Sequence, residues 1–214
     1  SEFTDSRDEN TYSYRLIGTQ VWMTENLAYL PSVQASDLGS DSSPRYYVYN
    51  YERDNIIDAK ITDEYIFYGV LYNWPAAMGG STSSSANPSG VQGACPSGWH
   101  LPSDAEWTTL TTYLGGESVA GGKMKETGNI GAETGLWNGS NFGATNVSGF
   151  SGRPGGFRSH DRGFAEIGNY GYWWSSTAET DSAAWRRYLS YLNRSVDRYY
   201  TANRIGLSVR CIRD

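Results

Sequence analysis

Residues able to carry acid–base chemistry are few, because the chain holds only two histidines, His100 and His160. His160 is followed by Asp161 in a glycine-flanked stretch, GGFRSHDRGF, and could act as a general base. Nothing pairs it with a nucleophile at a recognisable spacing, and GxSxG, P-loop and HExxH motifs are missing. His100 precedes a predicted helix start and is expected to bond a backbone carbonyl. We therefore expect no enzyme, with catalysis by His160 and Asp161 as the alternative.

The two cysteines, Cys95 and Cys211, are far apart in the sequence. They could form a disulfide that closes a long loop, which would fit an exported protein, or they could be two buried thiols. Because Lys is scarce while Tyr, Ser, Asn and Gly abound, as on many secreted surfaces, the composition favours the bridge. No Cys-x-x-Cys or Cys/His spacing indicates zinc, and we expect neither a metal nor a cofactor.

A segment near the C-terminus is suited to binding rather than reaction. Residues 186–205 read RRYLSYLNRSVDRYYTANRI, with five arginines, four tyrosines and one acid, although the whole chain has a net charge of −6. Tyrosine offers a large contact area at low entropic cost and arginine offers forked donors, so both recur at binding hot spots. Interleaved Arg and Tyr also suit stacking on single-stranded nucleic acid, but the negative net charge of the whole chain disfavours a nucleic-acid partner.

One helix is predicted by strong local signals in the stretch LPSDAEWTTLTTYLGG. Ser103 is the N-cap and Glu106 stands three residues on, which makes a capping box. Trp107 lies on the apolar face, and Gly115-Gly116 end the helix. Two further short helices are expected, at residues 75–78 and 121–126.

Strands are predicted from alternation and turn residues. Residues 12–23 indicate a hairpin with its turn at Gly18-Thr19. Residues 172–177 and 184–192 indicate strands, and residues 65–74 an extended element that runs into a helix. In the last stretch, IGLSVRCIR, alternation indicates a half-buried strand with one polar face. Residues 193–203, which follow the predicted strand at residues 184–192, are expected to form a loop.

The length of 214 residues suits one domain with a sizeable core. A 38% apolar fraction excludes wholesale disorder, and no apolar run could span a bilayer, so we expect no membrane insertion of this domain. We expect an α+β fold with small antiparallel sheets, one or two helices and long loops. Residues 1–11 are expected to be a leader that begins with a cloning scar, and residues 12–214 to be the domain.

Seven stretches stand in the order IGTQVWMTENL, YGVLYNWPAAM, CPSGWHLPSDAEWTTLTTYLGG, AGGKMKETG, GATNVSGFSGRPGGFR, IGNYGYWWSST and GLSVRCIRD. Together they closely resemble the Fibrobacter succinogenes major paralogous domain over nearly the whole chain. The resemblance implies a single C-type lectin-like domain, in the branch shared with formylglycine-generating enzyme. It also implies an exported protein, extracellular or at the cell surface, as in the lipid-anchored proteins of Bacteroidetes that carry such domains.

The resemblance bears on activity in two ways. It raises the alternative of an oxidase or hydrolase like formylglycine-generating enzyme, with His160 and Asp161 in the site. Those enzymes use a closely placed thiol pair in a substrate groove, whereas Cys95 and Cys211 stand in family motifs that look structural, as a disulfide or a core pair. The sugar-site triplets of calcium-dependent lectins, of the Glu-Pro-Asn or Gln-Pro-Asp type, are missing, so a calcium-mediated monosaccharide site is not expected.

Some members of this fold resemble the variable proteins of diversity-generating retroelements. In those proteins adenine-directed mutagenesis of AAY codons diversifies a binding patch near the C-terminus. Such codons cannot come to encode Lys, Glu, Gln, Met or Trp, and every residue from Arg186 to Ile205 belongs to the permitted set. Glu and Trp are common elsewhere in the chain. The pattern indicates a diversified binding face, although ordinary divergence of paralogues would produce it too.

The leading hypothesis is a noncatalytic ligand-binding domain whose binding segment is residues 181–205. Alternation places Arg186, Tyr188, Ser190 and Leu192 on one strand face and Trp185, Arg187, Leu189 and Tyr191 on the other. The predicted ligand-binding residues are Arg186, Tyr188, Ser190, Leu192, Asn193, Arg194, Asp197, Arg198, Tyr199, Tyr200 and Asn203. The predicted structural residues are Ser103, Glu106, Trp107, Trp173, Trp174, Trp185, Cys95 and Cys211. The expected partner is a protein or a cell-surface glycan.

Overall fold

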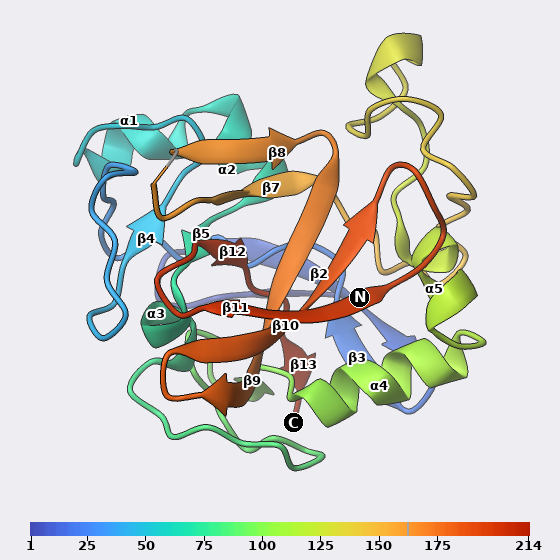
Figure 1. The fold of residues 1–214 in the computed structure, drawn as a ribbon, viewed down its shortest axis with the longest axis horizontal. Coiled ribbons are helices and arrows are strands. Elements are labelled where there is room, and N and C mark those ends of the chain that lie inside the picture. The colour runs from blue at the N-terminus through green and yellow to red at the C-terminus, as the bar shows by residue number, and fades with distance from the viewer. Residues whose placement is uncertain (162) are drawn as a thin grey trace.

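The computed structural model describes residues 1–161 and 163–214 and has a mixed architecture of two sheets with short helices around them (Figure 1). The first sheet has the order β1-β2-β3-β13-β6, and every pairing in it is antiparallel. Its strands are β1 Glu2–Thr4, β2 Thr11–Ile17, β3 Gln20–Met23, β6 Trp99–His100 and β13 Ile212–Arg213. This sheet brings the beginning and the end of the chain together.

The predicted hairpin is confirmed, because β2 and β3 pair around Gly18. Gly18 has a φ of +65°, a left-handed conformation that glycine adopts without strain. Before the hairpin, β1 pairs with β2 through contacts such as Phe3 opposite Tyr12. Residues 2–4, which lie in the predicted leader, thus form a strand at the edge of the sheet.

The second sheet has the order β11-β10-β9-β12-β5-β4, and β7 joins it at β9 with β8 on its other side. Its strands are β4 Tyr46–Tyr47, β5 Leu71–Tyr72, β7 Gly155–Arg158, β8 Phe164–Ile167, β9 Tyr170–Thr180, β10 Ala183–Ser190, β11 Asp197–Ala202 and β12 Leu207–Ser208. Antiparallel pairing dominates as predicted, but β12 and β7 each run parallel to β9. The predicted loop after β10 is wrong in its second half, because residues 197–202 form β11.

The strongest helix prediction is confirmed by α4 (Asp104–Tyr113), which has the full capping box. The Ser103 hydroxyl accepts from the Glu106 amide, and the Glu106 carboxylate accepts from the Ser103 amide at 2.9 Å. The other helices are α1 Ile56–Lys60, α2 Asp63–Tyr68, α3 Trp74–Met78, α5 Glu117–Met124 and a 3-10 turn at Ile130–Ala132. The chain is thus more helical than predicted, and residues 65–68 end a helix instead of starting a strand.

A cluster of aromatic rings joins α4 to both sheets. Trp22, Trp107, Trp137, Phe150 and Trp173 are at most 1% exposed, and Trp22 and Trp107 lie 4.8 Å apart between ring centroids. Full burial of such side chains contributes about 1.5–3 kcal/mol each. This cluster, together with a second one that includes Trp174, fixes the sheet on which the predicted binding segment lies.

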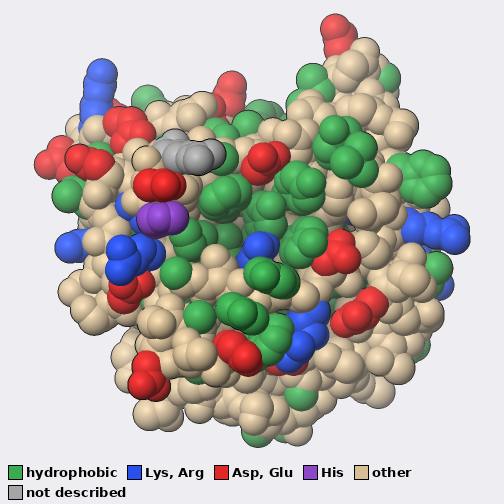
Figure 2. Space-filling view, viewed as in Figure 1, with side chains coloured by type: hydrophobic (Ala, Val, Ile, Leu, Met, Phe, Trp, Pro, Cys, Tyr) green, Lys and Arg blue, Asp and Glu red, His purple; other side chains and the backbone are tan. Residues whose placement is uncertain are grey.

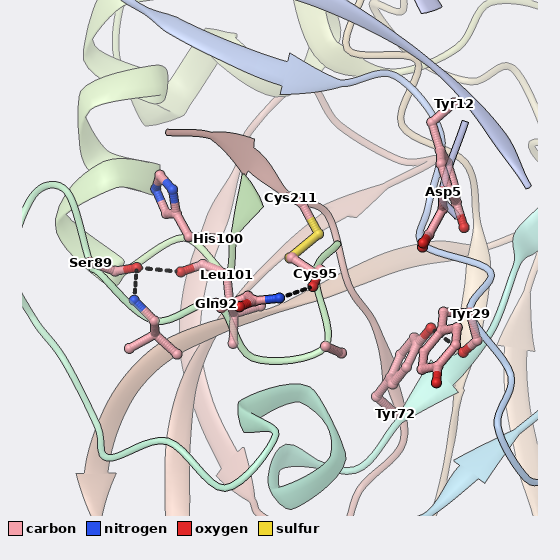
Figure 3. Close-up of a disulfide and its surroundings, with 12 residues drawn as sticks. Asp5, Tyr12, Tyr29, Tyr72, Ser89, Gln92, Cys95, His100, Leu101 and Cys211 are labelled. Atoms are coloured by element: carbon pink, nitrogen blue, oxygen red, sulfur yellow. Dashed lines mark hydrogen bonds between the residues drawn. A yellow bond between two sulfur atoms is a disulfide. The ribbon is translucent and has the colours of Figure 1, made fainter. Parts of the chain in front are cut away.

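Cys95 and Cys211 form a disulfide, so the alternative of two buried thiols is wrong (Figure 3). The two residues are 116 positions apart in sequence. The bond ties the loop before β6 to the segment that leads into β13. Within the same loop, the Gln92 side chain donates to the Cys95 carbonyl at 3.2 Å.

The end of the chain differs from its predicted strand. Residues 207–208 belong to the second sheet and residues 212–213 to the first, and both sides of the segment between 206 and 211 are covered. Ser208 and Arg210, predicted on a polar face, are at most 1% exposed. Arg210 is buried because its guanidinium donates to the carbonyls of Met23 and Phe150 and to the Asn26 side chain.

Candidate ligand-binding face

The sheet register decides which side chains of residues 183–202 lie together. β10 runs between β9 and β11, with Arg186 opposite Tyr199 and Tyr188 opposite Asp197. Side chains directly opposite one another in antiparallel strands share a face of the sheet. Arg186, Tyr188, Asp197 and Tyr199 therefore lie on one face, and the alternating residues of β10 and β11 lie on the other, toward α4.

Arg186 lies among tyrosine rings on the first of these faces. Its guanidinium carbon is 4.6 Å from the ring centre of Tyr172, 5.1 Å from that of Tyr188 and 6.0 Å from that of Tyr199. These distances allow cation–π attraction of about 0.5–2 kcal/mol each. Figure 2 shows apolar side chains gathered at the middle of this side of the molecule, with basic and acidic side chains among and around them.

Further rings from neighbouring strands extend this patch. The ring centroids of Tyr170 and Tyr172 in β9 are 5.6 Å apart, and the ring centroid of Phe157 in β7 lies 5.4 Å from that of Tyr172. We call the set Phe157, Tyr170, Tyr172, Arg186, Tyr188 and Tyr199 the tyrosine face. The sequence prediction did not include Phe157, Tyr170 or Tyr172. The spacing of two between Tyr170 and Tyr172 would have put both on one strand face, and it was the available signal.

The Arg186 guanidinium is poorly satisfied by the protein. Its Nε and Nη1 atoms are buried without a hydrogen-bond partner, and none of the ion pairs among the described residues includes it. Burial lowers the pKa of Arg186, although the phenol groups of Tyr172 and Tyr188, and a side-chain hydrogen bond with Tyr172, act in the opposite direction. A small cavity of about 160 Å³ opens beside it, lined also by Phe157, Tyr172, Thr201, Ile205 and Leu207.

The opposite face of β10 and β11 is fixed to the helix. Arg187 is fully buried and forms an ion pair with Asp104, the first residue of α4. Arg198 also pairs with Asp104, at 3.0 Å, and its guanidinium carbon lies 3.3 Å from the ring centre of Trp185. The register thus places Arg198 on the helix side, so its prediction as part of the same ligand face as Arg186 is wrong.

Two more predicted ligand contacts are wrong because the residues are buried. Ser190 is 2% exposed, and its hydroxyl accepts from the Leu192 amide. Asn203 is also 2% exposed; its side chain donates to the Asp181 carbonyl, and its own carbonyl accepts from the Trp74 amide. Both residues hold chain reversals beside β10, and neither reaches the surface.

The remaining predicted residues lie at the surface around the tyrosine face. Tyr199 and Tyr200 are 56% and 42% exposed. Tyr200 lies opposite Trp185 and so belongs to the helix-side face, but its ring stacks on that of Tyr199 at 5.1 Å between centroids and thereby borders the tyrosine face. Asn193 and Arg194 are exposed in the loop between β10 and β11, where Leu192 is 61% exposed. Asp197 accepts from the Ser195 hydroxyl at 2.9 Å.

This loop is attached to α5 and its neighbourhood through backbone atoms. The fully buried Lys125 ammonium donates to the carbonyls of Ser190 and Asn193, and also to that of Phe142. The Gly122 amide donates to the Arg194 carbonyl at 3.0 Å. A Cβ atom at Gly121 would lie 2.0 Å from the Ser195 carbonyl oxygen, so only glycine permits this approach. The sequence motif AGGKMK therefore forms the support of the loop.

The candidate catalytic pair is open to solvent. His160 Nε2 lies 3.7 Å from Asp161 Oδ2, and both side chains are more than half exposed. The Ser159 hydroxyl donates to the other oxygen of Asp161 at 2.9 Å. No group of His, Cys, Asp and Glu side chains suited to a metal ion occurs among residues 1–161 and 163–214.

His100 does not bond a backbone carbonyl, and that prediction is wrong. Its Nδ1 lies 2.7 Å from the Asp214 carboxylate and its Nε2 lies 2.8 Å from the Glu106 carboxylate. A groove of about 620 Å³ runs past it, lined also by Gln20, Trp99 and Asn87. Because both ring nitrogens are engaged, the imidazole links α4 to the last strand and does not present a nitrogen to the groove.

His100 should make folding stability depend on pH. Burial opposes its charged form, but the hydrogen bonds and charges of Glu106 and Asp214 outweigh this and raise the pKa of His100 above 6.5. A pKa raised on folding contributes stability that is complete below the unfolded pKa and is lost as pH rises through the folded pKa. In urea unfolding at pH 6, we expect the free energy of unfolding of the wild type to exceed that of His100→Gln by about 2 kcal/mol. This difference in stability should narrow as the pH rises toward 8.5. A gap that does not change with pH would contradict this.

The fold and the face define a disulfide-bonded α+β domain that combines a buried tryptophan frame with an exposed, tyrosine-rich sheet surface. Residues 16–213 match the family described as the Fibrobacter succinogenes major domain, and the chain belongs to that family. Comparison with curated proteins gave no match, and comparison with solved structures gave none either. Within the described residues, no helix is both long and apolar enough to cross a membrane.

Proposed function

We propose that this chain is a noncatalytic ligand-binding domain, displayed outside the cell, whose tyrosine face contacts a protein ligand. The carrying observation is the cation of Arg186 held within tyrosine rings beside the stacked, exposed Tyr199 and Tyr200. Tyr and Arg are the residue types that dominate hot spots of interfaces. The cavity of about 160 Å³ is below the 300–1,000 Å³ range typical of small-molecule sites, which favours a macromolecule. The disulfide supports an oxidising location.

The proposal predicts that Tyr199→Ala/Tyr200→Ala weakens binding to cell surfaces. Loss of two stacked hot-spot rings should lower affinity by at least about 2 kcal/mol, or roughly thirtyfold. The measurement is flow cytometry of biotinylated, tetramerised domain on fixed cells, before and after protease treatment, and on immobilised glycans. The matched control is Tyr113→Ala, which removes a 65% exposed tyrosine whose ring lies over Gly18.

Loss of binding after protease treatment would support a protein ligand, and retention with binding to a glycan would favour a cell-surface glycan instead. Equal binding by wild type and the double variant would overturn the assignment of the face. We expect the Tyr113→Ala domain to bind as wild type does.

We also propose that the binding segment is diversified by a retroelement. The pattern of burial supports this, because Leu192, Arg194 and Tyr199 are exposed while the neighbouring Leu189 and Val196 are at most 1% exposed. Substitution of exposed side chains usually changes stability by less than about 0.5 kcal/mol, so such positions tolerate change. A template repeat beside a reverse-transcriptase gene, differing from this gene only at adenines, is the expected finding; a neighbourhood without one would contradict the proposal.

We propose, finally, that the α+β arrangement is a C-type lectin-like fold. The pairing of β13 with β3, which joins the two ends of the family match, supports this, as does α4 packed on the central strands. An experimental structure with a different strand connectivity would contradict it.

A further inference from the structure

The arginines with buried guanidinium nitrogens differ in how those nitrogens are satisfied. Arg187 pairs with the Asp104 carboxylate. Arg158 donates to the carbonyls of Ser36 and Arg204 at 2.7 and 2.9 Å, and Arg210 donates to two carbonyls and to Asn26. Arg158, Arg187 and Arg210 each leave one buried nitrogen without an acceptor, whereas Arg186 leaves two, Nε and Nη1, and its neighbours are aromatic rings. A buried polar group left without a partner is destabilising, so a ligand that supplies an acceptor regains this energy.

The surroundings of Arg186 restrict what that acceptor can be. Acceptor oxygens with a negative charge make shorter and roughly twice stronger hydrogen bonds to guanidinium than neutral ones do. The walls of the adjoining cavity include Ile205 and Leu207, which suit a short carbon stem. Phosphate groups are commonly bound by clusters of basic side chains. Among the described residues that line this cavity, Arg186 is the one basic residue, and Asp197 lies opposite Tyr188 on the same face. One positive charge beside an apolar wall therefore matches a singly charged carboxylate on an alkyl stem.

We propose that the tyrosine face recognises its ligand through a carboxylate that bonds the Arg186 guanidinium, with the stem of that group in the cavity beside Leu207. This inference rests on the proposed ligand-binding function and adds the chemical class of the contacted group. The same chemistry occurs in an acidic side chain of a protein and in an acidic sugar of a glycan. The tyrosine rings hold the guanidinium in place before the ligand arrives, which reduces the entropy lost on binding.

The test compares propionate with its neutral isostere propionamide by NMR titration of the ¹⁵N-labelled domain at pH 6.5. The Arg186 Nε–Hε resonance, assigned by its loss in Arg186→Lys, should shift saturably with propionate and respond at least tenfold more weakly to propionamide. In Arg186→Met the backbone amides of Tyr172 and Thr201 should stop responding to propionate. In Arg194→Met, which removes an exposed arginine of the neighbouring loop, they should respond as in wild type.

Two further pairs distinguish the source of the carboxylate. N-acetylglutamate methylamide is compared with the glutamine derivative, and methyl glucuronide with methyl glucoside. Stronger binding of either acid than of its neutral partner supports the proposal. Equal effects of acids and neutral partners, or an equal response to methyl phosphate and propionate, would overturn it. The comparison of acids with their neutral partners uses the wild-type domain, so it tests the proposal even if Arg186→Met does not fold. A last outcome separates the two proposals. If the acids do not shift the Arg186 Nε–Hε resonance while Tyr199→Ala/Tyr200→Ala still loses cell-surface binding, only the carboxylate inference fails.

Discussion

Replacing both cysteines, Cys95→Ala/Cys211→Ala, should lower the free energy of unfolding by about 4 kcal/mol, because the bond closes a loop of more than 100 residues in the unfolded chain. Cys211 leads into β13, which pairs with β3 and β6. Without the bond the unfolded chain gains conformational freedom, and the native sheet loses the tie that holds its last strand. The loss should appear in urea unfolding as a lower midpoint, and the larger surface exposed should raise the m-value.

The control for this prediction is wild-type protein unfolded with a thiol reductant present. Both cysteines are fully buried, so reduction is expected only on unfolding, and the reduced wild type should then match the alanine variant in stability. The prediction fails if the double variant keeps the wild-type midpoint at an unchanged m-value.

Replacing Lys125 with methionine should lower the free energy of unfolding by about 3–5 kcal/mol, the range seen when one partner of a buried charged network is removed. The Lys125 ammonium donates to three backbone carbonyls at 2.8–2.9 Å and lies 5.4 Å from the ring centre of Trp137. Burial lowers the pKa of Lys125 to about 8. The three carbonyl oxygens are the hydrogen-bond acceptors of its ammonium group. Methionine fills the space but leaves the three oxygens without a donor.

The matched control is Lys123→Met, two residues earlier, in the last turn of α5. Lys123 donates to one carbonyl, that of Leu114 at 2.8 Å, and is only half-buried. Its loss should lower stability by about 1 kcal/mol, the usual contribution of one hydrogen bond. Equal effects of the two substitutions in urea unfolding would show that Lys125 has no special role. In Lys125→Met, amide hydrogen exchange should also speed up in residues 190–196.

The parts of the fold that the sequence predicted are those specified by neighbouring residues. The capping box of Ser103 and Glu106 and the turn at Gly18 depend on contacts within a few positions, so α4 and the β2–β3 hairpin follow from local chemistry. The prediction failed where distant segments decide. Residues 205–213 alternate in polarity as if one side faced water, yet Arg210 is buried, because carbonyls from residues 23 and 150 satisfy it.

The candidate site shows the same division. The placement of Arg186 and Tyr188 on one face follows from strand alternation and agrees with the register. That Arg198 lies outside the tyrosine face depends on β11, an edge strand whose exposed and polar residues gave no alternating pattern. It also depends on the ion pair of Arg198 with Asp104, which is nearly 100 positions away in sequence. The burial of Asn203 likewise depends on Trp74 and Asp181, which no local pattern reveals.

The support of the loop between β10 and β11 makes almost no use of the side chains that it supports. Lys125 binds the carbonyl oxygens of Ser190 and Asn193, Gly122 binds that of Arg194, and the Val196 amide donates to the carbonyl of Glu117. Since every residue type carries a carbonyl oxygen, these backbone contacts do not depend on which side chains the exposed positions of the loop carry. If the segment is diversified as we propose, one scaffold can therefore carry a large combinatorial set of surfaces at residues 192, 194, 199 and 200, and selection for a new ligand can act on them without first requiring compensating changes in the core.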